Sequence, residues 1–264
     1  MDRELREYIE DLRGQRLIDE EGLDFQLELL PPASKDDIIR LESIIPCSLP
    51  QDIRDLLELT SGFVYTPIEA LTFYNLEPFA HPPKPSVDGG DIITNEGPDH
   101  IFPCAMPIAN HGDGDQWVID LTAQSKNWGP IYFLAHDPPV IVYQSPNLRI
   151  FIDEVIEYGK ELAGEIADVM EFEVHQVWSD SSTGMLAEEC RNSDDMEIRK
   201  FARNLNGRWF IHDLRNAEIG DGFTWGRYGP HTKLARHGNL PIFAYEEPAE
   251  HQGFFTKLVK MLSG

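Results

Sequence analysis

Four side chains that could bind a metal ion lie close together near the middle of the chain: His111, Asp113, Asp115 and Asp120. An imidazole and three carboxylates are possible ligands for a divalent cation. The spacing departs from the calcium-binding EF-hand loop, because apolar residues 117–119 stand where that loop needs ligands. The favoured interpretation is a hairpin turn in which the Asp and Gly residues serve the backbone geometry.

Other candidate catalytic side chains lack the partners that catalysis requires. His136 and Asp137 are adjacent, so on an extended chain they point in opposite directions, and the prolines that follow make a turn the simpler account. The sequence contains no G-x-S-x-G, Walker-type or H-E-x-x-H motif. We therefore expect a protein that is not an enzyme and uses no cofactor. A metal-dependent enzyme built on the four residues above is the third hypothesis.

The charge balance is strongly acidic, with 46 Asp+Glu against 22 Lys+Arg and a formal net charge of −24. Phosphate is repelled by such a charge, so direct binding to nucleic acid is not expected. Residues 1–163 carry a net charge of −19, whereas residues 164–264 carry −5. Such a field attracts cationic partners and speeds their encounter by roughly 10- to 1000-fold at low salt, although it can also serve solubility alone.

The N-terminal sequence MDRELREYIEDLRGQR is charged from its second residue and lacks the apolar core of a signal peptide. No apolar run approaches the 18 residues of a membrane span. We expect a soluble, cytoplasmic protein that does not contact a membrane. The cysteines, Cys47, Cys104 and Cys190, are odd in number and widely spaced, so we expect them to be reduced and structural.

Hydrophobic spacing predicts an α+β fold in which helices pack on a central antiparallel sheet. Helices are predicted over 2–13, after the N-cap Ser34, from Pro50 to Leu59, and from 145 to about 175. Strand patterns occupy parts of 63–79, then 105–109, 116–121, 130–134 and 140–144, which indicates a meander. Residues 80–100 are rich in Pro and Gly and predict a long exposed loop.

The rest of the chain predicts a smaller α+β extension, so the proposed units are residues 1–175 and 176–264, separate or packed together. A linker at 179–184 precedes a helix with an Asp194–Glu197 capping box. Hairpins are predicted to pair 208–214 with 222–225 and 232–235 with 241–245, before a final amphipathic helix over 254–262. The basic run that contains Lys233, Arg236 and His237 is interpreted as a solvated hairpin edge, with contact to an anion or an acidic face as the alternative.

The order of motifs over residues 27–160 resembles the SUKH superfamily, which includes a yeast cell-wall-synthesis regulator and bacterial immunity proteins. The motifs are Leu29-Leu30-Pro31-Pro32-Ala33-Ser34, Leu49-Pro50, Ser61-Gly62-Phe63, Pro107-Ile108-Ala109, Gly112-Asp113-Gly114-Asp115, Trp117-Val118-Ile119-Asp120 and Phe151-Ile152-Asp153-Glu154. The resemblance implies a single α+β domain that binds proteins without catalysis. It does not extend to the Pro/Gly-rich loop or to residues after about 175.

The leading hypothesis is an acidic protein-binding module, of the immunity type, that neutralises a cationic toxin. The residues predicted to contact the partner, from the sign of their charge and their position in a loop or turn, are Asp88, Asp91, Glu96, Asp113 and Asp115. The alternative hypothesis is a regulatory scaffold in cell-wall synthesis or signalling, as the yeast branch of the resemblance implies.

Overall fold

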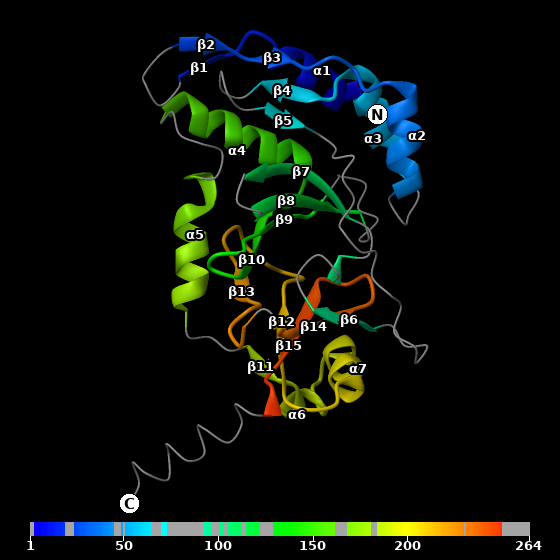
Figure 1. Ribbon diagram of the computed structural model, residues 1–264, viewed down its shortest axis with the longest axis vertical. Helices are drawn as coiled ribbons and strands as arrows, with labels where there is room; N and C mark the ends of the chain where they lie inside the picture. The colour runs from blue at the N-terminus through cyan, green and yellow to red at the C-terminus, as the bar shows by residue number, and fades with distance from the viewer. Residues whose placement is uncertain are drawn as a thin grey trace, which may run out of the picture.

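The computed structural model describes residues 3–18, 24–44, 49, 51–64, 70–72, 92–96, 101–102, 105–111, 115–121, 129–161, 168–180, 184–229 and 231–249. These residues form three layers that follow one another along the long axis of the molecule (Figure 1). The predicted final helix over 254–262 lies outside them.

The first layer, at the top of Figure 1, combines three helices with two small antiparallel sheets. The helices are α1 (Arg3–Asp11), α2 (Lys35–Ile44) and α3 (Gln51–Leu59). The strands are β1 (Arg16–Ile18) with β2 (Asp24–Gln26), and β4 (Gly62–Val64) between β3 (Glu28–Leu29) and β5 (Ala70–Thr72). The three helices predicted in this part of the chain are confirmed.

Ser34 caps α2 as the sequence predicts. Its Oγ accepts a hydrogen bond from the Asp37 N–H at 3.1 Å and donates one to the Asp37 carboxylate at 2.6 Å. The helix then buries Ile38 and Leu41 in the same core cluster as Leu56 of α3. The cap therefore fixes where the helix begins, and the apolar spacing fixes which of its faces is inside.

The central sheet has the strand order β13-β10-β9-β8-β7, and every neighbouring pair is antiparallel. Four strands follow one another in the chain: β7 (Ala105–His111), β8 (Asp115–Asp120), β9 (Ile131–Leu134) and β10 (Val140–Ser145). This is the predicted meander, and with the helices it confirms the predicted α+β class. The fifth strand, β13 (Gly222–Thr224), comes from much further along the chain.

Two helices follow the meander where the sequence predicts a single one. These are α4 (Leu148–Glu161) and α5 (Asp168–Ser179), which run in clearly different directions in Figure 1. The prediction of one continuous helix is wrong, because the apolar spacing is helical on both sides of residues 162–167 and does not reveal a change of direction. The inner face of α4 packs Phe151 against Trp117 and other side chains of the central sheet.

The third layer is a second antiparallel sheet with the order β11-β12-β15-β14-β6. Its strands are β11 (Met185–Leu186), β12 (Trp209–Asp213), β15 (Ile242–Glu246), β14 (Lys233–His237) and β6 (Ile92–Glu96). Two helices, α6 (Ala187–Cys190) and α7 (Met196–Asn204), pack on it.

Several predictions for this layer need correction. The hairpin of β14 with β15 is confirmed, but β12 pairs with β11 and β15, while residues 222–224 pair with β10. Residues 92–96 form a strand inside the predicted loop, because β14 offers them backbone groups from a distant part of the chain. The N-cap of α7 is Asp195, one residue after the predicted cap, and its carboxylate accepts from two N–H groups.

The two large sheets exchange one strand each. β13 leaves the C-terminal segment to pair with β10, and β6 leaves the N-terminal segment to pair with β14. The sheets also share a core that contains Tyr132 and Ile141 of the central sheet and Phe243 and Tyr245 of the other. These contacts cross the proposed boundary at residue 175, and whether either side folds alone stays a prediction.

Within the part of the chain that the structure describes, no helix combines the length and the apolarity needed to cross a membrane. Cys190 has a free thiol, and burial raises its pKa above the ordinary value for cysteine. Cys47 and Cys104 lie outside the described residues.

Candidate protein-binding surface

The residues predicted to contact a partner do not form one described cluster. Three of them lie outside the described residues: Asp88, Asp91 and Asp113. Glu96 ends β6, opposite Lys233 in the C-terminal sheet. Asp115 begins β8 in the central sheet, where its Oδ1 accepts a hydrogen bond from the His136 N–H at 2.7 Å. A role for these five residues in binding stays a prediction.

Asp120, which the metal hypothesis would use as a ligand, is buried in the core between the sheets. Its carboxylate accepts a hydrogen bond from Nη2 of Arg236 at 2.5 Å, and both side chains are 0% exposed. The carboxylate is therefore neutralised by a fixed cation from β14. Among the described residues, no group of three or more His, Cys, Asp or Glu side chains is arranged to hold a metal ion.

Arg236 satisfies its remaining donors with backbone carbonyls, those of Ile101, Asn239 and Leu240. Its guanidinium also lies over the rings of Phe102 and Phe243, at 5.5 and 5.3 Å from their centroids. The interpretation of this run as a solvated edge is wrong for Arg236 and His237, because β14 lies between β15 and β6.

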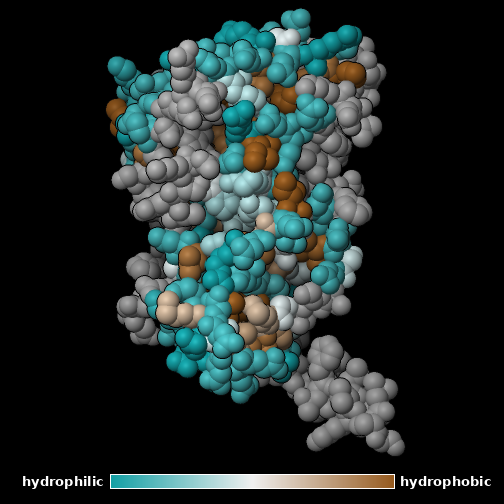
Figure 2. All heavy atoms as spheres, turned by 180° about the vertical axis from the view of Figure 1, so that it is seen from behind, coloured by the Kyte–Doolittle hydropathy of each residue, from teal (hydrophilic) through white to brown (hydrophobic). Residues whose placement is uncertain are grey.

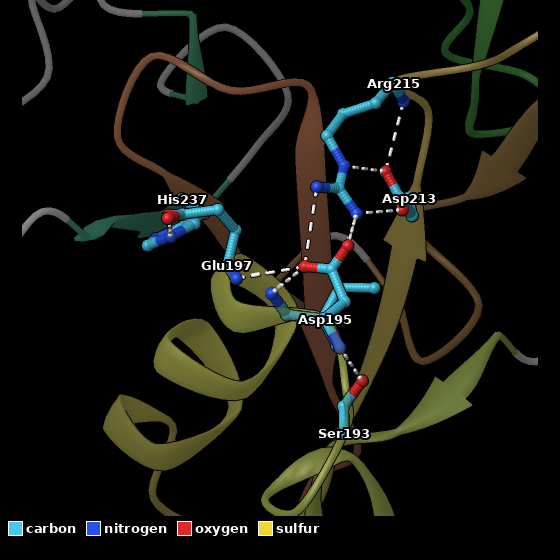
Figure 3. A network of polar contacts seen from close by, with 7 residues as sticks. Ser193, Asp195, Glu197, Asp213, Arg215 and His237 are labelled. Carbon is cyan, nitrogen blue, oxygen red and sulfur yellow. Dashed lines mark hydrogen bonds and ion pairs between the residues drawn. The ribbon is translucent and has the colours of Figure 1, made fainter.

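A polar network at the start of α7 gathers several charged residues (Figure 3). Nη2 of Arg215 lies 2.7 Å from the Asp195 carboxylate and 2.6 Å from the Asp213 carboxylate. Hydrogen bonding to Arg215 lowers the pKa of Asp195, so this N-cap stays ionised. The network ties the first turn of α7 to the end of β12.

The same helix positions Glu197 beside His237. Nε2 of His237 lies 2.8 Å from Oε2 of Glu197, and the imidazole stacks on Phe201 at 5.2 Å between ring centroids. His237 is 2% exposed. Glu197, His237 and Phe201 all belong to the third layer, so we interpret their contacts as structural.

The charges of Asp153 on α4 and Glu173 on α5 act on Glu154 of α4, and this set of three acids is called the carboxylate cluster. Glu154 is half-buried, and the Gln144 amide donates to its Oε2 at 3.5 Å. Gln144 is held in this orientation because its Oε1 accepts from the Trp117 indole N–H at 3.1 Å.

The surroundings of Glu154 disfavour the charged form of its carboxylate. Burial, and secondarily the charges of Asp153 and Glu173, raise the pKa of Glu154 to about 7, although the hydrogen bond from Gln144 acts in the opposite direction. No cationic side chain of the described part of the chain forms an ion pair with Glu154. The site would therefore be stabilised by a positive group brought by a partner.

The first helix contributes to the border of the carboxylate cluster. The Tyr8 hydroxyl on α1 donates to Asp153, and the guanidinium of Arg149 lies 4.9 Å from the centroid of the Tyr8 ring. Burial raises the pKa of the Tyr8 phenol, which therefore stays protonated. Sequence reasoning missed the cluster, since Tyr8 and Asp153 are 145 residues apart and only the adjacent acids at 153 and 154 give a local signal.

The described surface offers no large continuous apolar area on the face seen in Figure 2, where hydrophobic patches are scattered among hydrophilic ones. The large apolar side chains that are exposed come from separate elements: Ile39, Ile150, Trp178, Met185, Met196 and Ile219. Single exposed apolar residues are ordinary on protein surfaces. Charge is thus the more informative surface property of this molecule.

These features define an α+β protein whose described polar clusters are structural or acidic. Residues 32–154 match the SMI1 / KNR4 family (SUKH-1), which confirms the resemblance found in the sequence. At family level the match supports an immunity-type or regulatory module. The chain matches none of the curated proteins and none of the solved structures with which it was compared.

Proposed function

We propose that this protein is a non-catalytic binding module whose acidic N-terminal part captures a cationic protein, foremost a toxin that it neutralises. The observation that carries the proposal is the half-buried carboxylate of Glu154, which is under the influence of two further acidic charges and forms no ion pair with a cation of the described residues. The SUKH-1 match and the net charge of −19 over residues 1–163 support it.

A lysine or arginine of the partner would interact favourably with the carboxylate cluster. Burial and the charges of Asp153 and Glu173 disfavour the ionised form of Glu154, and the attraction of an incoming cation would offset both effects. Longer-range attraction by the remaining acidic residues would speed the encounter. The proposed partner is therefore a basic protein, with neither nucleic acid nor a membrane as the target, and the proposed location is the cytoplasm.

The proposal that the protein is not an enzyme draws support from Asp120, which Arg236 neutralises in the core. Titration calorimetry with calcium, magnesium and zinc tests the metal-dependent alternative. Stoichiometric binding of one of these ions would favour the metal-dependent alternative. A regulatory scaffold would use the same surface with a housekeeping partner, and the genes next to this one distinguish it from an immunity protein.

The decisive experiment expresses the protein together with a toxin encoded next to it and follows cell growth. We expect rescue by the wild type and a fast association that slows as salt rises, because the attraction is screened. The double variant Glu154→Gln/Glu173→Gln should associate at least several-fold more slowly. The matched control Glu188→Gln/Glu189→Gln removes two exposed acids of α6 and should leave the rate nearly unchanged. Rates that do not respond to ionic strength would contradict the proposal.

A further inference from the structure

The edge of β10 is covered by a strand from outside the family match. Residues 32–154 include β10, whereas β13 begins at residue 222. β13 is the outermost strand of the central sheet, so β10 is its one neighbour there. Between β12 and β14 the chain therefore leaves its own sheet, adds a strand to another sheet and returns.

Residues 220–226, called the inserted strand, follow the backbone of β10 closely. Val140, Ile141 and Val142 pair with Thr224, Phe223 and Gly222. Beyond these pairs, the Tyr143 N–H donates to the carbonyl of Asp221 at 2.7 Å, and the Trp225 N–H donates to that of Pro139 at 3.0 Å. This geometry is that of β-augmentation, in which an extended peptide completes an exposed sheet edge.

Side chains of the inserted strand are recognised on both faces. Phe223 and Trp225 are 2% and 4% exposed in the core between the sheets, and the Trp225 indole donates to the carbonyl of Ala135 at 3.1 Å. Thr224 points the other way and donates to the carbonyl of Val177 on α5 at 3.4 Å. The edge thus selects two aromatic residues with a small polar residue between them.

Two glycines let the inserted strand approach β10 this closely. A Cβ at position 222 would lie 2.2 Å from the carbonyl oxygen of Ile141, and one at position 226 would lie 2.6 Å from the Pro139 ring. A clash with backbone leaves little room for adjustment, whereas a proline ring can shift slightly. Gly222 is therefore the position at which the strand can be weakened selectively.

We propose that the edge of β10 is a peptide-binding edge, that the inserted strand is an autoinhibitory occupant of it, and that a partner strand with the pattern Gly-aromatic-Thr-aromatic can replace it. The inference rests on the proposed function only in that it assigns protein binding to residues 32–154, which match the SUKH-1 family. An intramolecular segment acts at an effective concentration of about millimolar, so micromolar partner strands bind only after the inserted strand has been loosened.

The test uses a synthetic peptide of residues 217–226 with the full-length chain. The peptide carries two acidic residues and no basic one, so its binding is independent of the attraction of cations. We expect micromolar peptide to bind the Gly222→Ala chain at least tenfold more tightly than the wild-type chain. Hydrogen exchange at the Tyr143 amide should be faster in the variant and slow again when the peptide is added. A peptide with the same Gly222→Ala change is the matched control and should not restore protection.

Three outcomes overturn the inference. In the first, the Gly222→Ala chain is folded and protects Tyr143 as the wild type does, so the strand is not released. In the second, Tyr143 is exposed and the peptide does not bind, so the edge does not accept strands. In the third, the wild-type chain binds the peptide as tightly as the variant does, so the inserted strand does not block the edge. If Gly222→Ala does not fold, Gly226→Ala provides a milder variant under the same criteria, because its one close approach is to the Pro139 ring.

Discussion

Asp120 and Arg236 form an ion pair that joins the central sheet to the C-terminal sheet, and neither side chain is accessible to water. Burial of two charges is costly, and their attraction offsets that cost only when the remaining polar atoms are also satisfied. Arg236 meets this condition through three backbone carbonyls. Loss of one partner would leave the other charge buried without compensation.

Replacement of Arg236 by Met should therefore lower the free energy of unfolding by about 3–5 kcal/mol, as breaking a buried pair does. Asp120→Leu combined with Arg236→Met should recover a large part of that loss, because no charge is then stranded. Urea denaturation followed by tryptophan fluorescence measures both variants. Lys233 lies on the same strand as Arg236 and forms a more exposed pair with Glu246 of β15, so Lys233→Met is the control and should change stability by less than about 1 kcal/mol. Equal effects of the buried and exposed changes would contradict this account.

Local patterns predicted the parts of the fold that depend on neighbouring residues. The cap at Ser34, the meander from β7 to β10 and the hairpin of β14 with β15 all connect residues close in the sequence. Each has its own signal, either a capping residue or an alternation bounded by turn residues.

Pairings between distant segments could not be predicted in this way. The strand that contains Arg236 has the composition of an exposed edge strand. Arg236 is nevertheless buried, because residues 92–96, which belong to a segment rich in Pro and Gly, pair with β14. The carboxylate cluster has the same origin, since the charge of Glu173 acts on Glu154 through the placement of two helices that both contact β10, which the sequence does not specify. Which residues are buried and which acids meet are therefore properties of the tertiary structure.

Substitution of Gly184 by Ala should destabilise the protein through two separable effects. Gly184 has φ +75°, and a Cβ there would lie 2.7 Å from His212 ring atoms and from the carbonyl oxygen of Ile211. Gly14 has φ +77° with nothing within 4 Å of its Cβ position, so Gly14→Ala carries the backbone cost alone, about 1 kcal/mol. We expect Gly184→Ala to shift the thermal midpoint clearly further than Gly14→Ala. Equal shifts would show that the clash is relieved without cost.

His212 should make the protein less stable in mild acid. The imidazole is stacked between Phe223 and Tyr245, and burial together with the nearby charge of Arg227 lowers its pKa to about 4. The unfolded state, with a pKa near 6.5, takes up the proton first, so stability is lost as the pH falls from about 6.5 towards 4. Between pH 7.5 and 5 the loss should be about 2 kcal/mol.

The variant His212→Phe keeps an aromatic ring between Phe223 and Tyr245 but cannot titrate. Urea denaturation at pH 7.5 and pH 5 should show that the advantage of the wild type over this variant shrinks in acid. A difference that is the same at both pH values would mean that His212 is not the group responsible.

Glu154 should make the protein less stable as the pH rises, the opposite of the effect of His212, over an overlapping pH range. Its pKa is raised to about 7 by burial and by Asp153 and Glu173, so the folded state holds a proton that the unfolded state has released. The stability from this group is complete below about pH 4.5 and is lost as the pH rises through 7. Glu154→Gln should therefore be more stable than the wild type at pH 8, by less than about 1 kcal/mol since the group is half-exposed, and nearly equal to it at pH 5.

The titrations of His212 and Glu154 can be separated, because the effect of each is measured as the difference in stability between the wild type and its own variant.

A cationic partner bound at the carboxylate cluster should hold Glu154 ionised, so the wild-type complex should release a proton near pH 7 and the Glu154→Gln complex should not. Isothermal titration calorimetry in two buffers of different ionisation enthalpy measures that proton. A wild-type complex that forms without proton release at pH 6.5 would place the partner away from Glu154, even if the partner is basic.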